Sequence, residues 1–124
     1  MANQSARLLG SWGESRAAGA YRAGGYRIVA MNYQSRFGEI DVIAENRRFI
    51  VFAEVKLRKS ARFARAGEYV DGGKQQRLIL TAGQWLAENE TEKQPRFDVV
   101  EIYAPDGIAT VKPEICITEN AFHE

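Results

Sequence analysis

The segment that most constrains the fold is "FIVFAEVKLR", residues 49–58, which is apolar at nearly every position before its charges begin. A strand with one face in water alternates apolar and polar side chains, whereas a strand covered on both faces can be apolar throughout. This segment therefore predicts a central strand. The preceding segment "GEIDVIAE" is separated from it by little more than Asn46 and Arg47, and Asn tolerates a left-handed turn, so the two segments predict a hairpin.

Helices and further strands are expected on either side of this hairpin. Residues 5–23 carry small and apolar residues on one helical stripe and end at Gly24 and Gly25. Residues 26–33 and 96–103 are rich in residues that favour strands, and residues 108–111 predict a short edge strand. A helix is expected over residues 73–90, with a core face of Leu78, Ala82, Trp85 and Leu86. The order helix, three strands, helix, strand predicts a mixed α/β fold.

Length and composition are those of one ordinary globular domain. The chain has 124 residues, of which 45% are hydrophobic and 27% charged. We expect a core over residues 5–111 and a loosely ordered tail over residues 112–124, anchored by Ile115 and Ile117. The single Cys116 forms no intrachain disulfide, and no stretch reads as a signal peptide or a membrane span, so a cytoplasmic protein is expected.

Charged side chains gather at the end of the hairpin away from its turn. Because side chains alternate along a strand, Glu54 and Lys56 share one face. A two-residue turn at positions 46 and 47 would set Asp41 across from Phe52, with Glu54 as its diagonal neighbour. The neighbouring register would set Asp41 and Glu54 directly opposite each other. Either register predicts two carboxylates and one ammonium group on the same face.

Such a group of carboxylates needs compensation, because like charges repel and burial removes their hydration. Oxygen ligands suit Mg²⁺ or Mn²⁺ better than zinc, for which the chain offers only Cys116 and His123. A metal held by two carboxylates beside a lysine indicates hydrolysis of a phosphodiester. The ordinary alternative is an exposed strand edge with a cross-strand ion pair, and the apolar surroundings of Glu54 favour the metal site over it.

The motifs that carry these residues are similar to those of a known family. "GESRAAGAYRAGGYRIVAMNYQSRFGEIDVIA", then "FAEVKLR", "VDGGKQQRL" and "RFDVVEI", resemble the YraN family of small bacterial proteins. That family resembles archaeal Holliday-junction resolvases of the PD-(D/E)XK nuclease superfamily. The resemblance implies a restriction-endonuclease-like α-β-β-β-α-β core with a mixed central sheet flanked by helices, the order already reached from the residues.

The resemblance also implies a role for each residue of the motif. Asp41 and Glu54 match the two metal-binding acids, Lys56 matches the catalytic lysine, and the backbone carbonyl of Val55 matches a further metal ligand. Glu14 matches an acid on the first helix that reaches the same metal and belongs to the catalytic group. Two alternatives for Glu14 stay open, namely a surface carboxylate and one paired with Arg16 or Arg22.

Two further positions accompany the motif. Glu39 belongs to the "GEID" string and is expected to flank the site. Lys74 begins the second helix, where it would touch phosphate, and its alternative is an exposed lysine at a helix end. The sequence departs from the usual family pattern at Ala53, where a larger β-branched residue is common, and in the glycine-rich "DGGK".

The net charge of +1, from 17 basic and 16 acidic residues, predicts no particular partner, so local charge must decide. The segment after the lysine carries Arg58, Lys59, Arg62 and Arg65 around Phe63, with no acid before Glu68. It could follow the phosphates of a nucleic acid beside the metal site. A solvated basic loop is the alternative.

Three functions are compatible with these features. The resemblance implies a Mg²⁺- or Mn²⁺-dependent endonuclease acting on branched or structured DNA, and, because a resolvase cuts two strands symmetrically, a homodimer. The second is a non-catalytic nucleic-acid-binding or adaptor module that retains the fold. The third is an RNA-directed nuclease, since no residue visibly distinguishes a 2′-hydroxyl.

Overall fold

The computed structural model describes residues 2–59 and 72–122. Their elements, in chain order, are α1 (Ala2–Ala23), β1 (Arg27–Ser35), β2 (Gly38–Glu45), β3 (Phe49–Arg58), α2 (Gly72–Glu88), β4 (Gln94–Tyr103), the 3-10 helix η3 (Gly107–Ala109) and β5 (Glu114–Phe122). The predicted mixed α/β fold is confirmed. Within these ranges no helix has both the length and the apolar character needed to cross a membrane.

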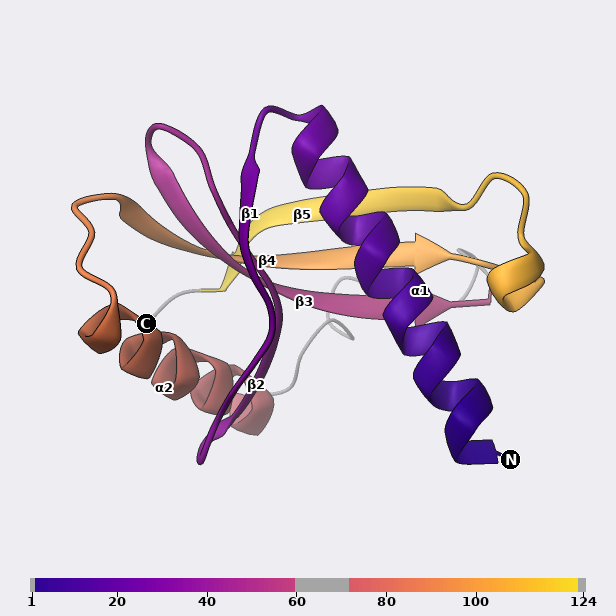
Figure 1. The fold of residues 1–124 in the computed structure, drawn as a ribbon, viewed down its shortest axis with the longest axis horizontal. Coiled ribbons are helices and arrows are strands. Elements are labelled where there is room, and N and C mark those ends of the chain that lie inside the picture. The colour runs from indigo at the N-terminus through magenta and orange to yellow at the C-terminus, as the bar shows by residue number, and fades with distance from the viewer. Residues whose placement is uncertain (1, 60–71, 123–124) are drawn as a thin grey trace.

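The strands form one mixed sheet in the order β1-β2-β3-β4-β5 (Figure 1). Strands β3 and β4 are parallel, and the other neighbouring pairs are antiparallel. A parallel pair requires a crossover connection, which here contains α2. The prediction that residues 49–58 form a central strand is confirmed, because β3 lies between β2 and β4.

Each face of β3 packs against a different helix. Ile50 and Phe52 belong to the core cluster beneath α2, together with Leu78, Ala82 and Trp85. Val51 and Ala53 alternate with them and belong to the cluster beneath α1, whose other members include Ala17, Tyr21, Val42, Val100 and Ile102. The two-sided burial explains why the strand is apolar at consecutive positions.

Gly13 allows α1 to lie close to β3. A Cβ atom at this position would lie 3.0 Å from Leu57 Cδ2, which is closer than ordinary van der Waals contact. Even alanine would therefore push the helix away from the strand or displace Leu57. Because Glu14 follows directly, this close approach also fixes how far the Glu14 side chain must reach toward the sheet.

The predicted turn of the β2–β3 hairpin is wrong by one position. Asn46 N donates a hydrogen bond to Phe49 O, so Arg47 and Arg48 form the tip. Asn46 Oδ1 accepts hydrogen bonds from Arg48 N and Phe49 N, at 2.9 and 2.8 Å. Asn46 therefore contributes its side chain to the turn and not a left-handed backbone.

The register follows from this turn. Residue pairing runs from Glu45–Ile50 to Val42–Ala53, and continuing it by one step places Asp41 level with Glu54. The expected pairing of Asp41 with Phe52 is wrong, and the neighbouring register that was left open is the one observed.

The predicted structure of the C-terminal part is also wrong. Residues 108–111 form no edge strand, because Gly107 takes a left-handed backbone at φ 58° and starts η3. Residues 114–122 form the strand β5 and not a loose tail. Ile115 and Ile117 pack against the cluster beneath α1, and Phe122 stacks on Phe97 at a centroid distance of 5.0 Å. These contacts hold β5 to the edge of the sheet.

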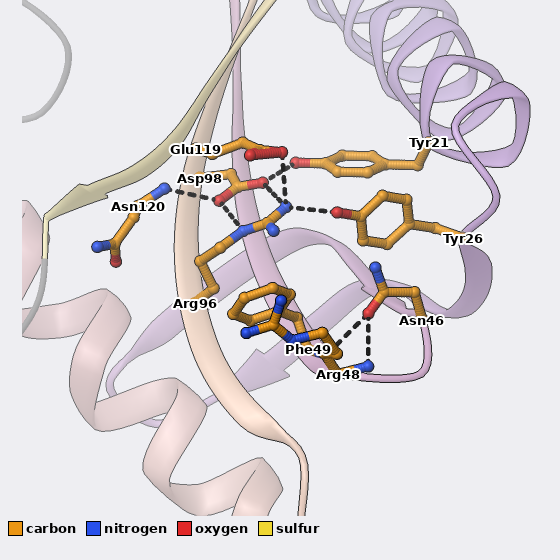
Figure 2. A network of polar contacts seen from close by, with 9 residues as sticks. All are labelled: Tyr21, Tyr26, Asn46, Arg48, Phe49, Arg96, Asp98, Glu119 and Asn120. Atoms are coloured by element: carbon orange, nitrogen blue, oxygen red, sulfur yellow. Dashed lines mark hydrogen bonds and ion pairs between the residues drawn. The ribbon is translucent and has the colours of Figure 1, made fainter.

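A buried polar network ties α1, β4 and β5 together (Figure 2). Asp98 is fully buried and accepts hydrogen bonds from Tyr21 Oη at 2.8 Å, from Asn120 N at 3.0 Å and from two nitrogens of Arg96 at 2.9 Å. The Arg96 guanidinium also donates to Tyr26 Oη at 3.0 Å. Both charges of this pair are thus matched by hydrogen bonds, as a buried ion pair requires.

Asp98→Asn should destabilise the protein by on the order of 3 kcal/mol, because the buried guanidinium of Arg96 loses its buried counter-charge and keeps only the exposed Glu119. The free energy of unfolding in urea measures this effect. Asp106→Asn is the matched control, because Asp106 is exposed and makes no side-chain capping hydrogen bond. Equal stabilities of the two variants would contradict a stabilising role for the network.

Candidate functional site

Four carboxylates from three elements approach one another. Glu14 lies on α1, Glu39 and Asp41 lie on β2, and Glu54 lies on β3. Single carboxylate oxygens of Glu14, Glu39 and Asp41 all lie within 4.8 Å of one another. The structure thus places Glu14 beside Asp41, and it brings Glu39 into the same group, where the sequence suggested only a flanking residue.

Asp41 is fixed at the point where β2 and β3 separate. Its Oδ2 accepts a hydrogen bond from Val55 N at 2.8 Å, just beyond the last paired residues Val42 and Ala53. Burial and the charges of Glu54, Glu14 and Glu39 raise the pKa of Asp41 to about 7, although the hydrogen bond from Val55 lowers it. This carboxyl is therefore partly protonated near neutral pH.

Glu14 has a similar electrostatic environment. Burial raises the pKa of Glu14, the charges of Glu39 and Glu54 raise it further, and hydrogen bonds with Asn32 and Asp41 lower it. Asn32 occupies the left-handed region at φ 54° on β1, which Asn adopts more readily than most residues. In the described part of the chain, Glu14 thus lies among acidic residues and Asn32, and not fully exposed on the surface or in a pair with Arg16 or Arg22.

Glu54 faces two lysines. Its side chain is buried, and its Oε1 lies 3.5 Å from Lys56 Nζ. Lys74, from the first turn of α2, forms an ion pair with the same oxygen. Burial and the neighbouring Lys74 lower the pKa of Lys56, with Glu54 acting in the opposite direction. Burial lowers the pKa of Lys74, but its contacts with Glu54 and Lys56 outweigh burial and raise it.

The predicted basic segment is described only at its start. Arg58 Nε lies 3.3 Å from Oε2 of Glu101, a buried acid on β4. Lys59 is exposed. Arg62 and Arg65 lie outside the described residues. Arg58 therefore emerges on the face of β3 that carries Glu54 and Lys56, two residues beyond the lysine.

The site thus has an acidic part and a cationic part. Glu14, Glu39 and Asp41 form the acidic part, and Glu54 lies between it and the two lysines. The donors are carboxylate oxygens, which suit a hard cation such as Mg²⁺ or Mn²⁺. Their mutual spacing is compatible with oxygens that share one ion, so the residues present fit such a metal.

Sequence reasoning missed Asn32 and the pairing of Lys74 with Glu54. Asn32 carried one weak signal, which is that Asn in a strand tolerates a left-handed residue. Glu39 could have been found from strand alternation, since it shares the face of Asp41. The ion pair of Lys74 depends on where α2 begins over the sheet, and no local pattern contains that information.

The stability of the metal-free protein should fall as pH rises from about 4 to about 7, and Asp41→Asn should remove part of this fall. Because the pKa of Asp41 is raised on folding, the folded state binds more protons than the unfolded state in this range. The variant should be more stable than wild type at pH 8, by on the order of 2 kcal/mol, and the difference should shrink as pH falls toward about 4.

Urea unfolding at several pH values in the presence of a chelator measures this difference. Asparagine keeps an oxygen that can accept the hydrogen bond from Val55 N, so the comparison isolates the charge. Asp106→Asn is again the control. An Asp41→Asn variant whose stability follows pH as wild type does would show that Asp41 is not protonated on folding.

Comparison with known proteins shows which family this chain belongs to. Residues 13–102 match the family described as "Uncharacterised protein family UPF0102". The UPF0102 protein STH1475 of Symbiobacterium thermophilum is 44% identical over 119 residues, which cover 94% of this chain and 98% of that protein. A UPF0102 protein of Rhodococcus opacus is 37% identical over 115 residues, or 92% and 95% of the two chains. The YraN resemblance is thus confirmed, and the chain belongs to the UPF0102 family.

Proposed function

We propose that this protein is a metal-dependent endonuclease that hydrolyses phosphodiester bonds in branched or otherwise structured DNA. The observation that carries the proposal is the convergence of Glu14, Asp41 and Glu54, from α1, β2 and β3, beside Lys56. Carboxylates in this number impose an electrostatic cost that a divalent cation would remove. The choice of branched DNA rests on the resemblance to resolvases.

Asp41, Glu54, Glu14 and the carbonyl of Val55 would hold Mg²⁺ or Mn²⁺, with Glu39 beside them. Within a strand the N–H and C=O of one residue point to the same side, so the hydrogen bond from Val55 N to Asp41 supports the proposal for the Val55 carbonyl. When bound, such a metal lowers the pKa of a coordinated water and neutralises charge that develops on the phosphate.

Lys56 would position the attacking water. Its ammonium group lies on the same strand face as Glu54, is partly buried, and has a lowered pKa. A lowered pKa makes proton exchange with a neighbouring water easier near neutral pH than for an ordinary lysine. The rigid central strand holds Lys56 and Glu54 at a fixed spacing, which favours this role.

DNA would approach along the end of β3. Arg58 and Lys59 follow Lys56 directly, and Lys74 begins α2 beside Glu54, so these three cations and the more distant Arg62 and Arg65 would contact phosphates. Each neutralised phosphate would steepen the salt dependence of binding. A four-way junction needs two symmetric cuts, so the proposal includes a homodimer, in the cytoplasm where DNA is present.

Cleavage assays on a four-way junction, a flap, linear duplex and single-stranded DNA test the proposal. With Mg²⁺ or Mn²⁺ the wild type should cut at least one substrate, and Asp41→Asn and Lys56→Ala should each lower the rate by roughly 10²-fold or more. Competition by RNA of the same sequence would separate a deoxyribonuclease from an RNA-directed enzyme.

Matched controls are Asp106→Asn for the acid and Lys112→Ala for the lysine, both at exposed positions away from the carboxylates. These controls should cut as wild type does. Binding of DNA without cleavage, unchanged in Asp41→Asn and Lys56→Ala, would overturn the nuclease proposal in favour of a non-catalytic adaptor module.

A further inference from the structure

We propose that Lys74 is a displaceable counter-ion of Glu54, which a divalent metal must expel before Glu54 can coordinate it. This inference rests on the proposed metal site. The proposed function gives Lys74 only the role of a phosphate contact, and the inference adds a second role to it. Its starting point is the ion pair between Lys74 Nζ and Glu54 Oε1.

Both lysines approach the same oxygen of Glu54. Lys56 Nζ lies 3.5 Å from Oε1, and Lys74 makes the closer contact with it. A carboxylate oxygen that coordinates Mg²⁺ or Mn²⁺ lies about 2.0–2.2 Å from the ion. An ammonium group in close contact with that oxygen would then repel the divalent charge at short range in a partly buried site. The metal and Lys74 therefore compete for Glu54.

Lys74 is better suited to leave than Lys56. Lys56 is two residues from Glu54 on the same strand face, so its position is fixed by the sheet. Lys74 projects from α2, and 34% of its side chain is exposed, against 25% for Lys56. It also stands in the first turn of the helix, where the helix dipole disfavours a positive charge. The ion pair with Glu54 helps to stabilise Lys74 there.

Metal binding would therefore change the position of the Lys74 ammonium group and so the positive charge that faces the substrate. Without metal, Lys74 helps to neutralise the buried Glu54, which within the described part of the chain also pairs with Lys56. With metal, the released ammonium group stands beside the site and can meet a phosphate. The two roles of Lys74, as counter-ion and as phosphate contact, then belong to two successive states.

Titration with Mn²⁺ by calorimetry, together with thermal unfolding, tests the displacement. The variants are Lys74→Met and Lys74→Gln, with Arg77→Met as the matched control that removes one exposed positive charge from the same helix. Both Lys74 variants should bind Mn²⁺ about tenfold more tightly than wild type, while Arg77→Met changes affinity little. Without metal they should melt at lower temperature than wild type, and added Mn²⁺ should raise their melting temperature by more.

A double-mutant cycle with Glu54→Gln separates displacement from a general charge effect. If Lys74 acts through Glu54, Lys74→Met should change Mn²⁺ affinity far less in the Glu54→Gln background than in wild type. A gain of the same size in both backgrounds would overturn the displacement. Binding of Mn²⁺ that no Lys74 variant alters would overturn the displacement but leave the metal site intact. Absence of Mn²⁺ binding in wild type and all variants would overturn the proposed metal site itself.

Discussion

The structure depends on the neutralisation of several carboxylates within a partly buried space. Each is compensated in a different way in the metal-free protein. Asp41 accepts a hydrogen bond from Val55 N and is partly protonated near neutral pH, while Glu54 pairs with Lys56 and Lys74. Glu14 has only partial compensation, since burial and its acidic neighbours raise its pKa. A fold would not retain this arrangement for stability alone, because apolar residues would pack there at lower cost.

The buried pair of Asp98 and Arg96 is an instructive contrast within the same sheet. Its hydrogen bonds come from α1, β4 and β5, its two buried charges are one positive and one negative, and the exposed Glu119 also pairs with Arg96. Such a closed network stabilises a fold. Among the residues that the structure describes, the carboxylate site brings four acids close to two lysines. The difference between the two networks is the physical basis for proposing a functional site at Glu14, Glu39, Asp41 and Glu54.

Sequence patterns predicted the elements that local periodicity defines and failed where side chains act across elements. The central strand and the shared face of Glu54 and Lys56 follow from alternation, so both could be predicted. The hairpin register was wrong because Asn46 caps the turn with its side chain. Strand β5 was missed because it mixes polar and apolar residues and is held by contacts with β4 and with the core cluster beneath α1. The residues around Glu14 are small, so the sequence did not decide on which face of the helix Glu14 lies. Lys74 and Glu54 are far apart in the sequence and meet only in the folded chain.

The central claim is that one divalent metal binds between α1, β2 and β3. Paramagnetic broadening of backbone amide signals by substoichiometric Mn²⁺ tests it most directly, without any substrate. The account predicts that the amides of Glu14, Asp41 and Val55 broaden first and that broadening decreases along β2 toward Arg47 at the hairpin tip. Broadening centred elsewhere, for example on Glu90 and Glu92 beside that tip, or no broadening at all, would contradict the claim.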